Sequence, residues 1–251
     1  MTAPAKGTVL VVGATSAIAR ALAAELARDG HALVLAARDL PEARAVAADV
    51  ALRFGVAARA VELDALDFDA HPRVLGRVIE EEGERLEGAV IAVGLTGEQE
   101  RAKDDFAEAR RIIDVNFTAC VSLLTVLAAP LERRGAGFLC VISSVAGERG
   151  RQSNYVYGAA KGGLTVYLQG LRNRLHPAGV RVMTVNPGFV DTRMTFGKPG
   201  TFLVASPDAV ARGIVRALRA GLDVVYLPGF WRPVMFAIRS IPELVFKRMK
   251  L

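Results

Sequence analysis

Seven short and almost wholly apolar runs recur along the chain, separated by longer segments with helical periodicity. They cover residues 8–12, 32–37, 58–63, 88–93, 137–142, 181–185 and 224–227. Runs of this kind are typical of strands that are buried on both faces of a parallel sheet, because the connecting helices cover both sides. Right-handed crossovers then predict a doubly wound α/β fold with one parallel sheet of the Rossmann type.

The intervening segments place apolar residues at helical spacing, most clearly over residues 17–29, 41–54, 106–133 and 155–175. The sequence has no repeat and no low-complexity linker that would separate two domains. We therefore expect a single domain over residues 1–228. Residues 229–251 are expected to form an amphipathic C-terminal extension, which Pro233 and Pro242 divide into two short pieces, and not a separate domain.

Composition excludes several classes of protein. The net charge is +6, but the arginines are dispersed among acids and are not interleaved with aromatic residues, so no nucleic-acid partner is expected. His31, His71 and His176 lie far apart and predict no metal site. Cys120 and Cys140 stand inside apolar runs, as buried free thiols do. No signal peptide is expected, and no apolar run approaches the ~20 residues that span a bilayer.

Residues 13–19, GATSAIA, lie between the first predicted strand and the first predicted helix. In a doubly wound sheet this turn binds a dinucleotide pyrophosphate through backbone N–H groups at the helix N-terminus. Gly13 would allow the tight turn, Thr15 and Ser16 would supply hydroxyl groups, and Ala17 and Ile18 would supply N–H donors. Alanine occupies positions 17 and 19, where such loops usually have glycine, so the loop alone also fits an ordinary strand-to-helix turn.

Tyr157 and Lys161 are four residues apart on a predicted helix and therefore share one face. An ammonium group beside a phenol favours the phenolate, so we expect the pKa of Tyr157 to fall below its usual value of about 10. Such a phenol could act as a general acid toward a carbonyl oxygen. Ser144 follows an apolar strand and Asn116 lies inside the segment 106–133. The alternatives for these residues are a surface contact, a strand-end cap and a helix kink.

The order and spacing of these residues, together with NPGFVDT at 186–192, resemble the short-chain dehydrogenase/reductase family over essentially the whole chain. The resemblance implies that Tyr157 donates a proton and that Ser144 hydrogen-bonds the substrate carbonyl. It also implies that Lys161 contacts the nicotinamide ribose and tunes Tyr157, and that Asn116 anchors a water of the proton relay. Two departures, the alanines at 17 and 19 and the sequence IAVGLTG after the fourth strand, bear on cofactor affinity more than on the chemistry.

The same resemblance implies a nicotinamide cofactor. Thr192 would meet the carboxamide and Asp64 the adenine. Where NAD-selective enzymes place an acid at the end of the second strand, this chain has Ala37 followed by Arg38. Because a guanidinium can pair with a 2′-phosphate, we expect NADPH to be preferred over NADH, unless Asp39 neutralises Arg38. The expected cofactor-binding residues are Gly13, Thr15, Ser16, Ala17, Ile18, Arg38, Asp64, Ala65, Gly94, Tyr157, Lys161, Pro187, Gly188, Val190 and Thr192.

Three stretches, DALDFDAHP, SSVAGERGRQSNYVYG and RSIPELVFKRM, resemble more narrowly the reductases of decaprenylphosphoryl-2-keto-ribose. This resemblance implies reduction of the 2-keto group of a polyprenyl-phosphate-linked pentose in cell-wall biosynthesis. Arg149 and Arg151 would then contact the phosphate, or be solvated charges. The other interpretations are a reductase of another lipid carbonyl, such as a 3-oxoacyl chain, and a non-catalytic NADP-binding regulator.

The extension 229–251 mixes aromatic and basic residues, which indicates a membrane interface or contact with a lipid chain. A dimerisation helix or a cover over the core would give the same pattern. The family resemblance implies a homodimer or homotetramer. We expect a cytoplasmic protein that is peripheral on the inner face of the plasma membrane.

Overall fold

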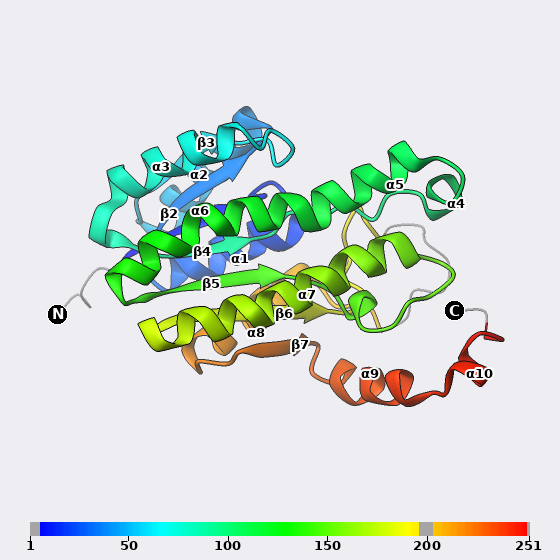
Figure 1. The fold of residues 1–251 in the computed structure, drawn as a ribbon. Helices are drawn as coiled ribbons and strands as arrows, with labels where there is room; N and C mark the ends of the chain where they lie inside the picture. The colour runs from blue at the N-terminus through cyan, green and yellow to red at the C-terminus, as the bar shows by residue number, and fades with distance from the viewer. Residues whose placement is uncertain (1–5, 196–202, 250–251) are drawn as a thin grey trace.

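The computed structural model of the chain describes residues 6–195 and 203–249. Within these residues, seven parallel strands form one sheet in the order β3-β2-β1-β4-β5-β6-β7 (Figure 1). Their bounds are β1 Thr8–Val12, β2 Ala32–Ala37, β3 Ala58–Glu62, β4 Leu86–Ile91, β5 Gly137–Ile142, β6 Val180–Pro187 and β7 Val224–Leu227. The strand order reverses between β1 and β4, which leaves a crevice at the carboxyl ends of these strands. The expected doubly wound sheet is confirmed.

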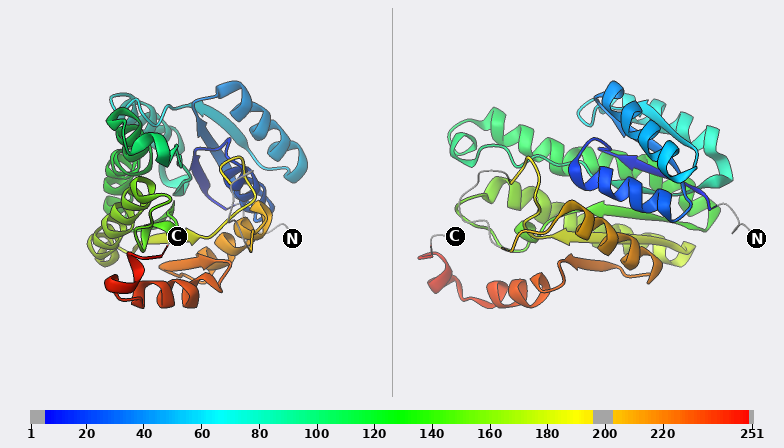
Figure 2. Two further views of the ribbon diagram at one scale, coloured as in Figure 1. Left: turned by 90° about the vertical axis from the view of Figure 1, so that its right-hand side faces the viewer. Right: turned by 180° about the vertical axis from the view of Figure 1, so that it is seen from behind.

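Helices cover both faces of the sheet (Figure 2). One apolar core lies between the sheet and helices α1 (Ala17–Arg28), α2 (Leu40–Phe54) and α8 (Pro207–Arg219). The other lies between the sheet and helices α3 (Ala70–Glu82), α6 (Ala119–Arg134) and α7 (Tyr155–Leu175). Side chains of β1 alternate between the two cores, with Val9 and Val11 in the first and Leu10 and Val12 in the second.

The longest helical segment is made of α5 (Phe106–Ile113), the π-helical turn η2 (Asp114–Thr118) and α6. Contrary to the expectation from the sequence, residues 106–134 are long and apolar enough to cross a bilayer by length and composition. The leucines of α6 nevertheless pack in the second core, with those of α7. Helix α6, the apolar part of this segment, is therefore a core helix of the α/β fold.

The remaining elements are short and lie mainly around the carboxyl edge of the sheet. They are the helices α4 (Gln99–Ala102), α9 (Trp231–Ser240) and α10 (Glu243–Phe246), and the 3-10 turns η1 (Gly83–Arg85), η3 (Val145–Gly147) and η4 (His176–Ala178). Pro242 separates α9 from α10, as expected. The expectation that Pro233 also interrupts the extension is wrong: Pro233 lies in the first turn of α9, where a helix does not need its N–H group.

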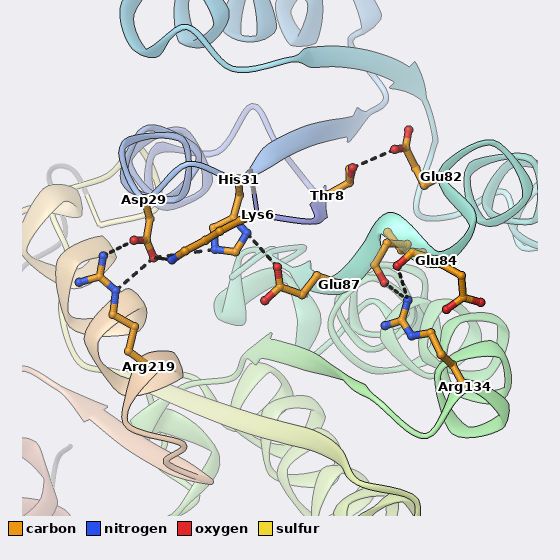
Figure 3. Close-up of polar contacts among 10 residues, drawn as sticks. Lys6, Thr8, Asp29, His31, Glu82, Glu84, Glu87, Arg134 and Arg219 are labelled. Atoms are coloured by element: carbon orange, nitrogen blue, oxygen red, sulfur yellow. Dashed lines mark hydrogen bonds and ion pairs between the residues drawn. The ribbon is translucent and has the colours of Figure 1, made fainter. Parts of the chain in front are cut away.

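A network of charged side chains closes the opposite, amino-terminal edge of the sheet (Figure 3). Asp29 pairs with Arg219 and, at 2.8 Å, with Lys6. Nδ1 of the buried His31 lies 3.2 Å from a carboxylate oxygen of Glu87. The network joins the segment before β1, the turn between α1 and β2, strand β4 and helix α8 at the amino-terminal edge of the sheet. The crevice lies at the opposite edge.

Candidate active site

A cavity of about 740 Å³ opens at the carboxyl edge of the sheet, over the ends of β1, β2, β4, β5 and β6. Every residue expected to bind the cofactor lines this cavity, and so does Ser144. Asn116 lies behind the wall and is fully buried. The fold thus brings together residues that are up to about 180 positions apart in the sequence, as the carboxyl edge of a parallel sheet does.

The turn after β1 has the geometry of an anion-binding loop. Gly13 adopts a φ of 82°, and a Cβ atom there would lie 2.8 Å from the carbonyl oxygen of Ala92, so only glycine fits. Ser16 caps α1 by accepting a hydrogen bond from the N–H of Ala19 at 3.3 Å. The N–H groups of Ala17 and Ile18, in the first turn, have no intrahelical acceptor, and both residues line the cavity. Alanine at position 17 leaves these donors in place.

Arg38 lines the cavity at the end of β2. The expected alternative was that Asp39 neutralises it. Asp39 instead caps α2, since one of its carboxylate oxygens accepts the N–H of Glu42 at 3.0 Å. Within the described ranges, Arg38 forms no ion pair. The Arg38 guanidinium, with no acidic partner among the described residues, is therefore available at the position that distinguishes the two nicotinamide cofactors.

Asn116 joins the long helical segment to the loop after β4. Its Nδ2 donates to the carbonyl oxygens of Leu95 at 2.6 Å and Ile112 at 2.8 Å, and its Oδ1 accepts the N–H of Leu95 at 3.1 Å. The π-helical turn η2 contains Asn116, so the side chain satisfies a helix carbonyl near the point where the regular ladder is interrupted. A Cβ atom on Gly94 would lie 3.3 Å from Asn116 Oδ1 and 3.6 Å from Lys161 Nζ.

Three glycines let the η3 turn lie directly on helix α7. A Cβ atom on Gly147 would lie 2.6 Å from the backbone nitrogen of Gly162, and one on Gly158 would lie 2.9 Å from the carbonyl oxygen of Ala146. This close contact brings Ser144 near enough to Tyr157 for its hydroxyl to favour the ionised phenol and lower the pKa of Tyr157. The Ser144 hydroxyl also accepts the N–H of Ala146 at 3.1 Å.

Tyr157 and Lys161 are both buried, and their electrostatics differ from the expectation. Burial raises the pKa of Tyr157 to about 12, against a smaller lowering by Ser144. The predicted lowering by Lys161 is wrong, because its ammonium group donates to the carbonyl oxygens of Ile142 at 3.0 Å and Val93 at 3.4 Å. Burial also lowers the pKa of Lys161. The phenol of Tyr157 therefore keeps its proton at neutral pH.

The sequence model of the short chain dehydrogenases matches residues 7–199. The chain belongs to the short-chain dehydrogenase family. This dehydrogenase is 42% identical over 241 residues to an uncharacterised oxidoreductase of Mycobacterium tuberculosis, a match that covers 96% of each chain. It is 29% identical over 189 residues to the 3-oxoacyl-[acyl-carrier-protein] reductase FabG of Aquifex aeolicus, covering 74% of this chain and 75% of that protein.

A similar solved structure is the short-chain dehydrogenase from Sphingobium yanoikuyae in complex with NADPH. The TM-score is 0.79 at 26% identity, and the match covers 94% of this chain and 97% of that one. Family membership and this likeness make the protein an NAD(P)-dependent oxidoreductase with the Rossmann-type fold. The cavity fits such a cofactor, since the Gly13 turn, the free N–H donors at the start of α1 and Arg38 supply a donor set for phosphate groups.

In the dehydrogenase, the segment after β6 forms another wall of the cavity and rests on the C-terminal extension. A Cβ atom on Gly188 would lie 1.9 Å from Nε1 of Trp231, so the indole ring packs directly against this glycine. Val190 forms a bridge with Ala205, and the N–H of Thr192 donates to Oγ1 of Thr195 at 3.2 Å. The extension therefore supports the wall of the site.

Arg149 and Arg151, expected to contact the substrate, do not line the cavity. Arg149 binds the extension: its guanidinium donates to Glu243 at 2.7 Å and to the carbonyl oxygen of Ile241 at 3.2 Å, and lies 4.2 Å from the ring centroid of Phe246. Arg151 is partly buried, and across the described part of the chain its buried Nε has no acceptor. Burial lowers the pKa of Arg151.

Sequence reasoning missed several residues that line the cavity, including Arg20, Leu95, Arg111, Val115, Arg193, Met194 and Thr195. Some of them had a signal in the sequence. Arg111 and Val115 are four residues apart in the segment that contains Asn116, and residues 193–195 directly follow Thr192. Arg20 had no signal in the sequence. Its side chain is placed by an ion pair with Glu42, which depends on how α1 packs against α2.

Proposed function

We propose that this dehydrogenase uses NADPH to reduce a ketone, and that the ketone is the 2-keto group of a polyprenyl-phosphate-linked pentose. The observation that carries the reductase assignment is the buried pair Ser144 and Tyr157 at the wall of the cavity, with Lys161 one helical turn from Tyr157. The preference for NADPH rests on Arg38, which has no acidic partner in the described residues. The assignment of a phosphate-linked pentose as the substrate rests on the sequence resemblance and on the charge of Arg151.

A reduced nicotinamide held in this cavity would supply a hydride to the carbonyl carbon. Tyr157 supplies the proton to the carbonyl oxygen, and a pKa of about 12 keeps that proton on the phenol until a more basic alkoxide develops beside it. The Ser144 oxygen accepts the N–H of Ala146, which leaves its hydroxyl hydrogen to donate. Ser144 can therefore orient the carbonyl oxygen and help to stabilise the charge that develops on it.

Lys161 and Asn116 restore the proton in this proposal. The Lys161 ammonium is held by the carbonyl oxygens of Val93, just after β4, and Ile142, at the end of β5. We propose that it contacts the cofactor ribose and delivers a proton toward Tyr157. Asn116 Oδ1 accepts one hydrogen bond and has a second lone pair for a water. Thr192 would hold the carboxamide and Asp64 the adenine, while the N–H groups of Ala17 and Ile18 would bind the pyrophosphate.

Arg151 supports a substrate that carries a phosphate group. A partly buried guanidinium is costly unless an anion or an acceptor compensates it, and Arg151 has neither among the described residues. A phosphate on the substrate would supply both. The guanidinium of Arg149 is already occupied by Glu243 and Phe246, so we now propose the phosphate contact for Arg151 alone. A lipid-linked substrate also fits a cytoplasmic enzyme at the inner face of the plasma membrane, acting as a homodimer or homotetramer.

The test is incubation with a polyprenylphosphoryl-2-keto-ribose and NADPH, with nicotinamide absorbance and the product sugar followed together. We expect oxidation of NADPH and formation of the corresponding arabinose, with the Tyr157→Phe variant inactive. Reduction of a 3-oxoacyl thioester in preference to the keto-sugar would refute the pentose and favour the alternative that the likeness to FabG supports. Binding of NADPH without turnover of either substrate would refute the proposed reduction and favour a regulator.

A further inference from the structure

The C-terminal extension is fixed to the catalytic domain through one side of its helices. Trp231 and Met235 on α9 and Phe246 on α10 are buried, and Trp231 and Met235 form an apolar cluster with Val145. Polar contacts add to this attachment, because Arg149 holds the α10 carboxylate of Glu243. The inner side of the extension therefore contacts the turn that carries Ser144 and the wall at Gly188.

The opposite side of the extension exposes large apolar side chains. Phe236 is 67% exposed, Leu244 is 62% exposed and Val245 is 52% exposed. Phe230 and Met249, at the two ends of the same segment, are also exposed. Phe236 is not on the α9 stripe formed by Trp231, Met235 and the half-buried Ile238, so it cannot turn into the core without rotating the helix. Apolar residues gathered in this way mark an interaction surface.

The same surface is cationic. Arg232, Lys247 and Arg248 are exposed, and none of them pairs with an acid in the described residues. Glu243 is the single acid between positions 229 and 249, and Arg149 neutralises it. Arg239 pairs with Glu148 at 3.5 Å. The extension thus presents apolar side chains beside positive charges that have no counter-ion among the residues the structure describes.

We propose that this outer surface, residues 230–249, docks on the surface of an anionic lipid bilayer. Apolar side chains that enter the boundary between headgroups and acyl chains, flanked by cations that meet anionic headgroups, are the chemistry of interfacial helices. A second copy of the chain fits less well, because a two-fold contact through the same surface would bring uncompensated cations of both copies together. Figure 1 shows α9 and α10 at one end and one side of the molecule, so docking would leave the helices on the opposite side of the sheet free of the membrane.

The inference does not depend on the pentose proposed above, since it concerns binding to vesicles in the absence of any substrate. Removal of the whole extension is an unsuitable test, because it would also remove the buried Trp231 and Phe246. Substitutions on the outer surface avoid this problem. The full-length chain is therefore tested by co-sedimentation with phosphatidylcholine vesicles that contain or lack phosphatidylglycerol.

We expect the wild type to bind the anionic vesicles and to be released by salt. In the triple variant Arg232→Gln/Lys247→Gln/Arg248→Gln, binding should fall about a hundredfold, at about fivefold for each charge. The variant Phe236→Ser/Leu244→Ser should bind the anionic vesicles at least about tenfold more weakly than the wild type. A matched control is Leu52→Ser/Phe106→Ser, which replaces side chains that are 87% and 77% exposed elsewhere on the molecule. Its binding should equal that of the wild type.

Equal sedimentation with and without phosphatidylglycerol would overturn the inference, and so would wild-type binding by the triple variant. An equal loss of vesicle binding in the Leu52/Phe106 control would also overturn it, because exposed apolar side chains anywhere on the molecule would then promote binding. Size-exclusion chromatography gives a further outcome: if Phe236→Ser/Leu244→Ser dissociates an oligomer and leaves vesicle binding unchanged, the surface is a protein interface. Should the apolar variant fail to fold, the triple charge variant still decides the question, and turnover of NADPH reports separately on the proposed function.

Discussion

The contact between Gly188 and Trp231 predicts that two substitutions, each harmful alone, partly rescue one another. In Gly188→Ala the added methyl group would lie 1.9 Å from the indole nitrogen, so the tryptophan ring must move. Gly188 does not have a positive φ, so the backbone tolerates alanine and the effect is purely steric. Overpacking of this kind costs about 1–3 kcal/mol of unfolding free energy.

Trp231 is 2% exposed, and its replacement by alanine should cost about 3–5 kcal/mol because it removes a buried aromatic side chain and leaves a cavity. In the double variant the Cβ atom of the alanine at position 188 occupies part of the cavity that loss of the indole ring creates. The second substitution should then cost nothing, which gives a favourable coupling of about 1–3 kcal/mol between the two sites. Since Gly188 lines the cavity, Gly188→Ala should also weaken NADPH binding.

The assay is urea unfolding of the wild type, both single variants and the double variant at one protein concentration, with equal m-values required for comparison. A matched control is Gly170→Ala in α7, where the added Cβ has no atom within 4 Å. This control should stabilise the protein by up to about 1 kcal/mol, because alanine favours a helix over glycine. Additive costs for the double variant would refute the argument, since they would show that Trp231 does not occupy the space above Gly188.

Three further predictions concern the cavity. Arg38→Gln should lower kcat/KM for NADPH about tenfold or more, because it removes a charge-assisted hydrogen bond to the 2′-phosphate, and should leave kcat/KM for NADH unchanged. An equal loss of kcat/KM for both cofactors would contradict this role. Because the pKa of Tyr157 is raised from 10 to about 12, its contribution to stability is complete below pH 10 and is lost as pH rises toward 12. Tyr157→Phe should therefore flatten the fall in Tm over that interval, and an unchanged slope would argue against the raised pKa. Asn116→Leu leaves three buried or partly buried backbone groups without their hydrogen-bond partner. It should lower the free energy of unfolding, measured in urea, by at least about 3 kcal/mol. A loss below about 1 kcal/mol would show that these hydrogen bonds contribute little.

Local patterns in the sequence predicted most of the elements that form the site. The apolar runs gave the strands, since a strand buried on both faces must be apolar throughout, and β1, β2, β5 and β7 begin and end where expected. Strand β4 starts two residues earlier than predicted, at Leu86, because its register beside β1 pairs Leu86 with Thr8. Helix α8 was missed although Ser206 and Pro207 form a recognisable helix start, with Ser206 Oγ accepting the N–H of Ala209.

The catalytic spacing could also be read from the sequence, but its electrostatics could not. The spacing of four positions from Tyr157 to Lys161 places both side chains on one helix face, whatever surrounds it. Whether the ammonium points to the phenol or to backbone carbonyls depends on β4 and β5, which end beside α7 and offer the carbonyl oxygens of Val93 and Ile142. Burial of the phenol follows from the same packing and raises its pKa, in the direction opposite to that inferred from the pair alone.

The sequence by itself determined the α/β class, the succession of strands and helices along the chain and the residues that gather at the carboxyl edge of the sheet, because periodicity and spacing are local properties of a chain. Only the tertiary structure decided that Arg149 binds the C-terminal extension while Arg151 has no partner among the described residues. It also decided that Trp231 supports the wall of the site while Phe236 faces outward. These differences arise from contacts between segments far apart in the chain and from exclusion of water around them. Neither exists until the sheet and its helices have packed.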